Sequence, residues 1–155
     1  MTDTRTMRCA AAVIALWALG SPSSANAQAG VGTWERQGPQ RPGQPLTMTV
    51  EPCCRAGRRL IYRIPGIDVV MTVESPFDGS EVPVLLGGKP SGETMAITQT
   101  DDHHWTTILK MNGQLFGTSK GALSADGRTI TVENDFAATV GGNAAGKSTE
   151  TWVKK

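Results

Sequence analysis

Apolar and polar residues alternate in short segments along most of the chain beyond residue 45. Leu60, Tyr62 and Ile64 share one side of one such segment. Arg59 and Arg63 share the other side. A period of two is the pattern of a β-strand that buries one face and exposes the other. This pattern, repeated along the chain, predicts a half-buried sheet.

Segments of this kind recur at short intervals, each bounded by turn-forming residues. We predict strands near residues 46–51, 59–64, 67–74, 81–86, 93–99, 103–111, 114–123, 128–135 and 147–153. Three connections contain Asp78-Gly79, Asn112-Gly113 and Asp126-Gly127, dipeptides that accept the positive φ angles of a tight hairpin. Two longer connections, 87–92 and 141–146, share a Gly-Gly-x-x-x-Gly pattern.

Hairpin connections order the strands as an antiparallel up-and-down meander, and no segment is left to cover it with helices. Gly and Pro, 18 and 9 residues, interrupt regular helix throughout. We therefore predict an all-β fold in which the meander closes into a barrel of about 8–10 strands, since closure removes exposed edges. A β-sandwich is the alternative. The face expected inside carries Val69, Met71, Val73, Met95, Ile97, Trp105, Leu109, Met111, Ile130 and Val132.

The first residues have the composition of a secretory signal peptide. Arg5 and Arg8 precede an uncharged run at 9–20, too short to span a bilayer, and Ala-x-Ala patterns end at Ala27 and Ala29. We predict a signal peptide over residues 1–27 and one domain over 28–155. The destination expected for such a chain is a bacterial periplasm or the medium, and no further apolar stretch is long enough to span a membrane.

The charge balance excludes a nucleic-acid-coating protein. The chain has 15 basic and 14 acidic residues, and removal of residues 1–27 takes Arg5, Arg8 and Asp3 and leaves 13 of each sign. A protein that coats nucleic acid needs an excess of positive charge.

Both ends of the predicted domain carry residues typical of a known barrel family. Gly32-Thr33-Trp34 stands near its start, and Thr151-Trp152-Val153-Lys154-Lys155 ends the chain. The chain resembles the lipocalin-like (calycin) barrels, and in particular small exported bacterial members without an assigned activity. The resemblance implies that Trp34 plugs one end of the barrel and that Lys154 packs over its indole.

Residues 141–148 match the phosphate-binding loop pattern G-x-x-x-x-G-K-[ST]. That loop needs a following helix, whose N-terminus binds the phosphates. Only seven residues follow Ser148, and they have a strand pattern. We therefore predict no nucleotide binding and a turn instead.

Asp101, Asp102, His103 and His104 are adjacent and could bind a metal ion. Successive strand residues point to opposite faces, and tetrahedral zinc requires three or four ligands. We predict a polar rim without metal, with a ligand-gating or pH-sensing role for the histidines as the alternative.

Cys53 and Cys54 are adjacent in a turn after Pro52. Three states are open in an oxidising compartment: a disulfide between them, a disulfide to a partner chain, or two free thiols. Nearby, Arg55, Arg58, Arg59 and Arg63 form the main charge cluster. We expect them on a solvated barrel face, with contact to an anionic ligand or to lipopolysaccharide as the alternative.

The predicted interior is rich in methionine, which fits either a packed core or an adaptable pocket. The ligand-cavity candidates are Tyr62, Met71, Met95, Trp105 and Met111. We predict a non-enzymatic protein that binds a small apolar or amphipathic molecule and uses no cofactor. A filled structural module of the cell envelope is one alternative. A small barrel isomerase or cyclase, relying on Tyr62 or His104, is the other, although no catalytic set is recognisable.

Overall fold

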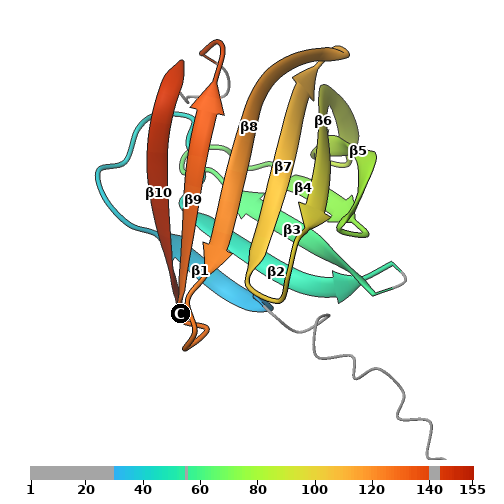
Figure 1. Cartoon of the computed structure of the whole chain (residues 1–155). Coiled ribbons are helices and arrows are strands. Elements are labelled where there is room, and N and C mark those ends of the chain that lie inside the picture. The colour runs from blue at the N-terminus through green and yellow to red at the C-terminus, as the bar shows by residue number, and fades with distance from the viewer. Residues whose placement is uncertain (1–29, 55, 140–143) are drawn as a thin grey trace, which may run out of the picture.

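The protein is a closed antiparallel β-barrel (Figure 1). A computed structural model describes residues 30–54, 56–139 and 144–155, and none of these residues is helical. The strands are β1 (Gly32–Arg36), β2 (Thr47–Cys53), β3 (Gly57–Arg63), β4 (Met71–Ser75), β5 (Asp78–Leu86), β6 (Lys89–Gln99), β7 (His104–Met111), β8 (Gln114–Leu123), β9 (Thr129–Phe136) and β10 (Gly146–Lys154).

Consecutive strands pair from β2 to β10. Strand β1 pairs with both β2 and β10 and so closes the barrel. In the closing register Trp34 lies opposite Met48 of β2 and Lys154 of β10. The predicted closed meander is therefore confirmed. The prediction lacked β1, because five residues with one buried side chain in front of a Pro-rich connection carry almost no alternation signal.

Two predicted hairpin turns are confirmed. Asn112 and Gly113 join β7 to β8 with φ values of 48° and 80°, both positive as this two-residue turn requires. Asp126 and Gly127 lie in the β8–β9 connection, where the Gly127 amide donates to the Ser124 carbonyl over 2.8 Å.

The other connections differ from the prediction. Asp78 and Gly79 begin β5, and the turn falls one step earlier, where Phe77 has a φ of 61°. Only Gly87 and Gly88 form the β5–β6 turn, so the predicted 87–92 loop is wrong and most of it is strand β6. The predicted 141–146 connection lies partly outside the described residues, and β10 begins at Gly146.

The predicted strand at 67–74 is wrong in its first half. Ile67 and Val69 are 44% and 43% exposed, and β4 begins only at Met71. The Ile67 amide donates to the Ile64 carbonyl over 3.2 Å, closing a turn in which Gly66 has a φ of 76°. Because the chain turns at residues 64–67, the first residues of the predicted strand lie in this connection and not in β4.

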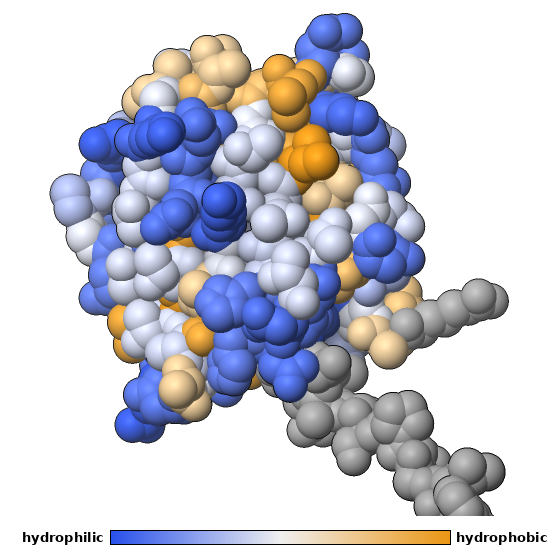
Figure 2. Space-filling model, viewed as in Figure 1, coloured by the Kyte–Doolittle hydropathy of each residue, from blue (hydrophilic) through white to orange (hydrophobic). Residues whose placement is uncertain are grey.

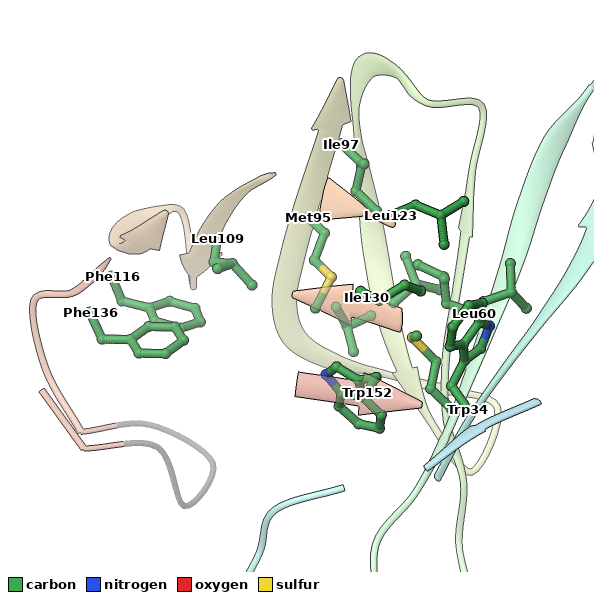
Figure 3. Packing of buried hydrophobic residues seen from close by; sticks show 14 residues of the cluster. Trp34, Leu60, Met95, Ile97, Leu109, Phe116, Leu123, Ile130, Phe136 and Trp152 are labelled. Carbon is green, nitrogen blue, oxygen red and sulfur yellow. The ribbon is translucent and has the colours of Figure 1, made fainter. Parts of the chain in front are cut away.

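The barrel interior carries the hydrophobic core (Figure 3). Two glycines on β8 make space for aromatic rings of the neighbouring strands. A side chain at Gly121 would overlap the indole of Trp105 on the neighbouring strand, and one at Gly117 would overlap the ring of Phe136. Glycine therefore serves here to admit large neighbours rather than to make a turn. The face shown in Figure 2 is mostly hydrophilic, with a small hydrophobic area near its upper edge.

Candidate functional site

An internal cavity of about 230 Å³ runs through the barrel. Its wall combines residues from eight strands, all except β1 and β5, because alternate side chains along a barrel strand point inward. Many are apolar, among them Val50, Leu60, Ile97, Leu109, Ile130 and Trp152. An apolar cavity of about 150 Å³ takes benzene, so this one suits a molecule of roughly nine heavy atoms. The barrel is hollow enough for one small ligand.

Four of the five cavity candidates lie in this wall. They are Tyr62, Met71, Met95 and Trp105. Met111 instead packs against the core as a partly buried side chain. Met48, which the cavity prediction omitted, is buried and also lines the cavity.

One arginine of the predicted surface cluster points into the barrel. Arg58 is 6% exposed and lines the cavity, so its expected place on a solvated face is wrong. Its Nη2 donates to Oε1 of Gln99 over 3.1 Å, and its Cζ lies 4.5 Å from the ring centroid of Phe77. Burial lowers the pKa of Arg58. The signal was present in the sequence, since Arg58 has the same strand parity as Leu60 and Tyr62.

Arg59 and Arg63, by contrast, lie outside. Arg59 Nη2 is 2.7 Å from Glu74 and its Nη1 is 3.9 Å from Glu51 on the neighbouring strands. Arg55 lies outside the described residues.

Two glutamates that the sequence analysis did not single out also line the cavity. Burial raises the pKa of Glu93 and of Glu150; for Glu150 the charge of Arg36 and the indole of Trp152 partly offset it. Burial, with added repulsion from Glu150 and Glu93, raises the pKa of Tyr62. Tyr62 is therefore a neutral hydroxyl at neutral pH, and both acids lie close enough to it for their charges to act on it.

Trp34, which the resemblance predicts as the barrel plug, lies in β1. Trp34 is fully buried, and its Nε1 donates to the Gly30 carbonyl over 2.8 Å. Nζ of Lys154 lies 5.6 Å from the indole centroid. A side chain at Gly32 would come within 2.8 Å of Cε of Lys154. Gly32 thus gives the lysine stem its path over Trp34.

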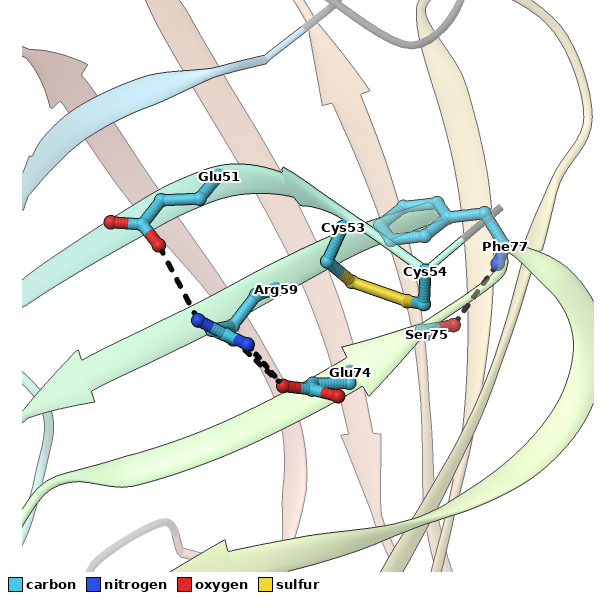
Figure 4. Close-up of a disulfide and its surroundings, with 7 residues drawn as sticks. All are labelled: Glu51, Cys53, Cys54, Arg59, Glu74, Ser75 and Phe77. Carbon is cyan, nitrogen blue, oxygen red and sulfur yellow. Dashed lines mark hydrogen bonds and ion pairs between the residues drawn. A yellow bond between two sulfur atoms is a disulfide. The ribbon is translucent and has the colours of Figure 1, made fainter. Parts of the chain in front are cut away.

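A disulfide joins Cys53 and Cys54 at the β2–β3 turn (Figure 4). Both sulfurs are used within the chain in this state, so neither is available to a partner. The turn packs closely, because a side chain at Gly57 would overlap the carbonyl oxygen of Ser75. This tight turn leads directly into Arg58.

The histidine pair lies on a polar rim. Oδ1 of Asp101 accepts the backbone amides of His103 and His104 over 2.8 and 2.9 Å, and these bonds, together with the imidazole of His104, lower the pKa of Asp101. The His104 side chain is 59% exposed and does not line the cavity. His104 is therefore not placed for the polar role that the isomerase hypothesis required. Asp102 reaches the cavity wall.

Other site types have little support in the described part of the chain. No group of three or more His, Cys, Asp or Glu residues there could hold a metal ion. Lys147 and Ser148 of the phosphate-loop pattern lie in β10, where no helix follows. Residues 30–54, 56–139 and 144–155 contain no helix that is long and apolar enough to cross a membrane.

Comparison with known proteins identifies the fold. No family model matches the chain, and no curated protein matches it. Among solved structures, a mutant of the fluorescent protein UnaG is similar, with a TM-score of 0.53 and 8% identity over 81% of this chain and 95% of that chain. At that identity the likeness concerns the fold alone. It supports the calycin-like barrel that the terminal motifs implied.

Proposed function

We propose that this protein is an exported, non-enzymatic barrel that binds one small apolar or amphipathic molecule in its interior. The observation that carries the proposal is the cavity of about 230 Å³ inside a closed barrel. A protein serving only as a filled structural module would gain packing energy by closing such a space. The adaptable thioethers of Met48, Met71 and Met95 around the cavity suit a ligand of variable shape.

Ligand binding can be tested with indole, naphthalene and octan-1-ol. Trp105 and Trp152 line the cavity and report on it by fluorescence, and calorimetry gives an independent affinity. Met95→Phe should weaken binding, because the larger ring takes up part of the cavity and replaces a flexible thioether. Ile108→Phe is the matched control, because Ile108 faces solvent on the adjacent strand β7. If none of the three molecules binds to the wild-type protein, or if Met95→Phe binds them equally well, the cavity is not a ligand site.

Export to the periplasm or the medium of a bacterium is part of the same proposal. Residues 1–27, with their basic start, short apolar run and Ala-x-Ala end, support it. Expression of the full chain in a bacterial host, followed by fractionation and N-terminal sequencing, tests it. A mature N-terminus at Gln28 or Gly30 agrees with cleavage after Ala27 or Ala29. An uncleaved protein in the cytoplasm would contradict it.

A further inference from the structure

Three uncharged polar side chains form a row across the inner wall of the barrel. Thr107 on β7 lies opposite Ser119 on β8, and Ser119 lies opposite Asn134 on β9. All three line the cavity. Thr107 and Asn134 are only 8% and 7% exposed, so very little of their surface meets the outer solvent. These three residues, called the polar row below, turn two hydroxyls and one amide toward the cavity.

The polar row has no hydrogen bond to the rest of the described chain. Neither the hydroxyls of Thr107 and Ser119 nor the amide of Asn134 bonds to any residue of 30–54, 56–139 and 144–155. Their polar atoms are not sealed within the described part of the protein either, so they are open to the cavity. Buried polar groups in native proteins bond to protein, ligand or water. The polar row is therefore available to a molecule that enters the barrel.

Apolar side chains border the polar row. Ser119 stands between Gly117 and Gly121 on β8. The ring of Phe136 lies against the first glycine, and the indole of Trp105 lies against the second. The remaining neighbours on the inner face of β7 and β9 are Leu109 and Val132. A ligand group at the polar row thus meets uncharged hydrogen-bonding partners with an aromatic ring on either side.

Among neutral groups, a carboxamide matches the polar row most completely. Asn134 carries an acceptor oxygen and N–H donors in one plane, and the hydroxyls of Thr107 and Ser119 can donate or accept. Facing side chains of paired strands have Cβ atoms about 5 Å apart, so one compact group can bond to two of them at about 2.9 Å each. A ketone or a carboxylate only accepts and leaves the oxygen of Asn134 unpaired, whereas a carboxamide both donates and accepts.

We propose that the ligand carries a neutral carboxamide, as a primary amide or a lactam, whose N–H and C=O groups bond to Asn134 and to the hydroxyls of Thr107 and Ser119. The apolar part of the ligand packs against the aromatic rings that border the polar row. This inference rests on the proposed ligand-binding function and specifies its ligand class. Arg58 and Glu93 also line the cavity, so selection of a charged ligand is the competing outcome of the test.

Five probes with one phenyl ring and the same number of heavy atoms test the proposal: benzamide, acetophenone, cumene, benzoate and benzamidine. Benzamide donates and accepts, acetophenone only accepts, cumene does neither, and the last two carry opposite charges. Calorimetry on the purified product of the full chain gives the affinities. We expect benzamide to bind roughly 5-fold more tightly than acetophenone, and more tightly than both ions. This comparison uses only the wild-type protein and is independent of how any variant folds.

Thr107→Val and Asn134→Leu replace polar groups of the row by apolar groups with equal numbers of heavy atoms. We expect affinity for benzamide to fall roughly 5-fold in the first and roughly 10-fold in the second, because one and two hydrogen bonds are lost. Affinity for cumene should stay the same or rise. The Tm should not fall, because the lost groups have no partner in the described part of the chain. Thr106→Val is the matched control, since Thr106 is the exposed neighbour on β7.

The outcomes separate the two proposals. Equal binding of benzamide and acetophenone overturns the carboxamide preference and leaves the ligand-binding function intact. Tightest binding of benzoate or benzamidine overturns it in favour of the charged side chains of the cavity. Unchanged benzamide affinity in both row variants means that the polar row binds only water, and an equal loss in Thr106→Val means that the effect is not local; each result overturns the preference. If none of the five probes binds, the preference is also wrong, and the ligand-binding function fails only if indole, naphthalene and octan-1-ol do not bind.

Discussion

Replacing Gly121 by alanine should force the indole of Trp105 out of its place. The two residues face each other across β7 and β8, and an added Cβ at Gly121 would overlap Cε2, Cζ2 and Nε1 of the ring. The backbone of β7 cannot retreat, because β7 is paired with β6 on one side and β8 on the other. The ring must therefore turn, and since Trp105 lines the cavity, the open space lies inward.

The expected cost follows from overpacking a folded core. Insertion of an extra methyl group into a packed site costs about 1–3 kcal/mol, and the size of this overlap places Gly121→Ala near the middle, at about 2 kcal/mol. For a domain of this size the Tm should fall by roughly 5–10 °C. The indole also takes up cavity volume, so affinity for octan-1-ol should fall as well.

A double-mutant cycle with Trp105→Leu provides the assay. Urea unfolding of the wild type, both single variants and the double variant gives the coupling free energy. We expect Gly121→Ala to lose at least half of its cost when Trp105 is already leucine, because the smaller side chain leaves room for the methyl group. An equal cost in both backgrounds would refute the steric explanation, and so would a cost below about 0.5 kcal/mol in the wild type.

Three further perturbations have definite expected results. Trp34→Ala should lower the free energy of unfolding by about 3–5 kcal/mol, measured by urea unfolding, because it empties a fully buried site, and Trp34→Phe should cost less. Glu93→Gln should stabilise the protein at pH 7 and lose that advantage as the pH falls. Burial raises the pKa of Glu93 in the folded state, so the wild type loses stability as the pH rises above the ordinary glutamate range, whereas glutamine stays neutral. Thermal unfolding of both proteins from pH 4 to 8 checks this, and a difference in Tm that does not change with pH would contradict it. Reduction of the Cys53–Cys54 bond should change the free energy of unfolding by only about 1 kcal/mol or less, since a bond between adjacent residues closes almost no chain loop in the unfolded state. Measurement of Tm with and without reductant checks this, and a loss of several kcal/mol would show that the turn depends on the bond.

Much of the barrel was predictable because strand periodicity is local. Leu60 and Tyr62 fall at alternate positions, out of phase with Arg59 and Arg63, so the inward face of β3 can be recognised from the sequence alone. Arg58 falls on the same alternating positions as Leu60 and Tyr62, which by itself predicts an inward side chain. The prediction placed Arg58 outside instead, because arginine side chains are almost always exposed. For the short strand β1 the pattern itself is missing, because Trp34 is the only buried residue in it and one residue shows no alternation.

Other features have no local signal at all. Val69 alternates in step with Met71, and only the turn at Gly66 shows that it lies outside the strand. Glu93 is one polar residue among many in the sequence. Its place beside the cavity depends on which neighbours β6 finds in the closed sheet.

The sequence by itself determined the strand pattern and the main hairpins, since side-chain alternation and turn chemistry act between residues close in the chain. Only the tertiary structure decided that the interior is hollow and that charged side chains line it. This cavity is the volume left between side chains of eight strands, and its charge depends on which residues, such as Arg58 and Glu93, face the same space. Both are properties of residues far apart in sequence, so periodicity cannot contain them.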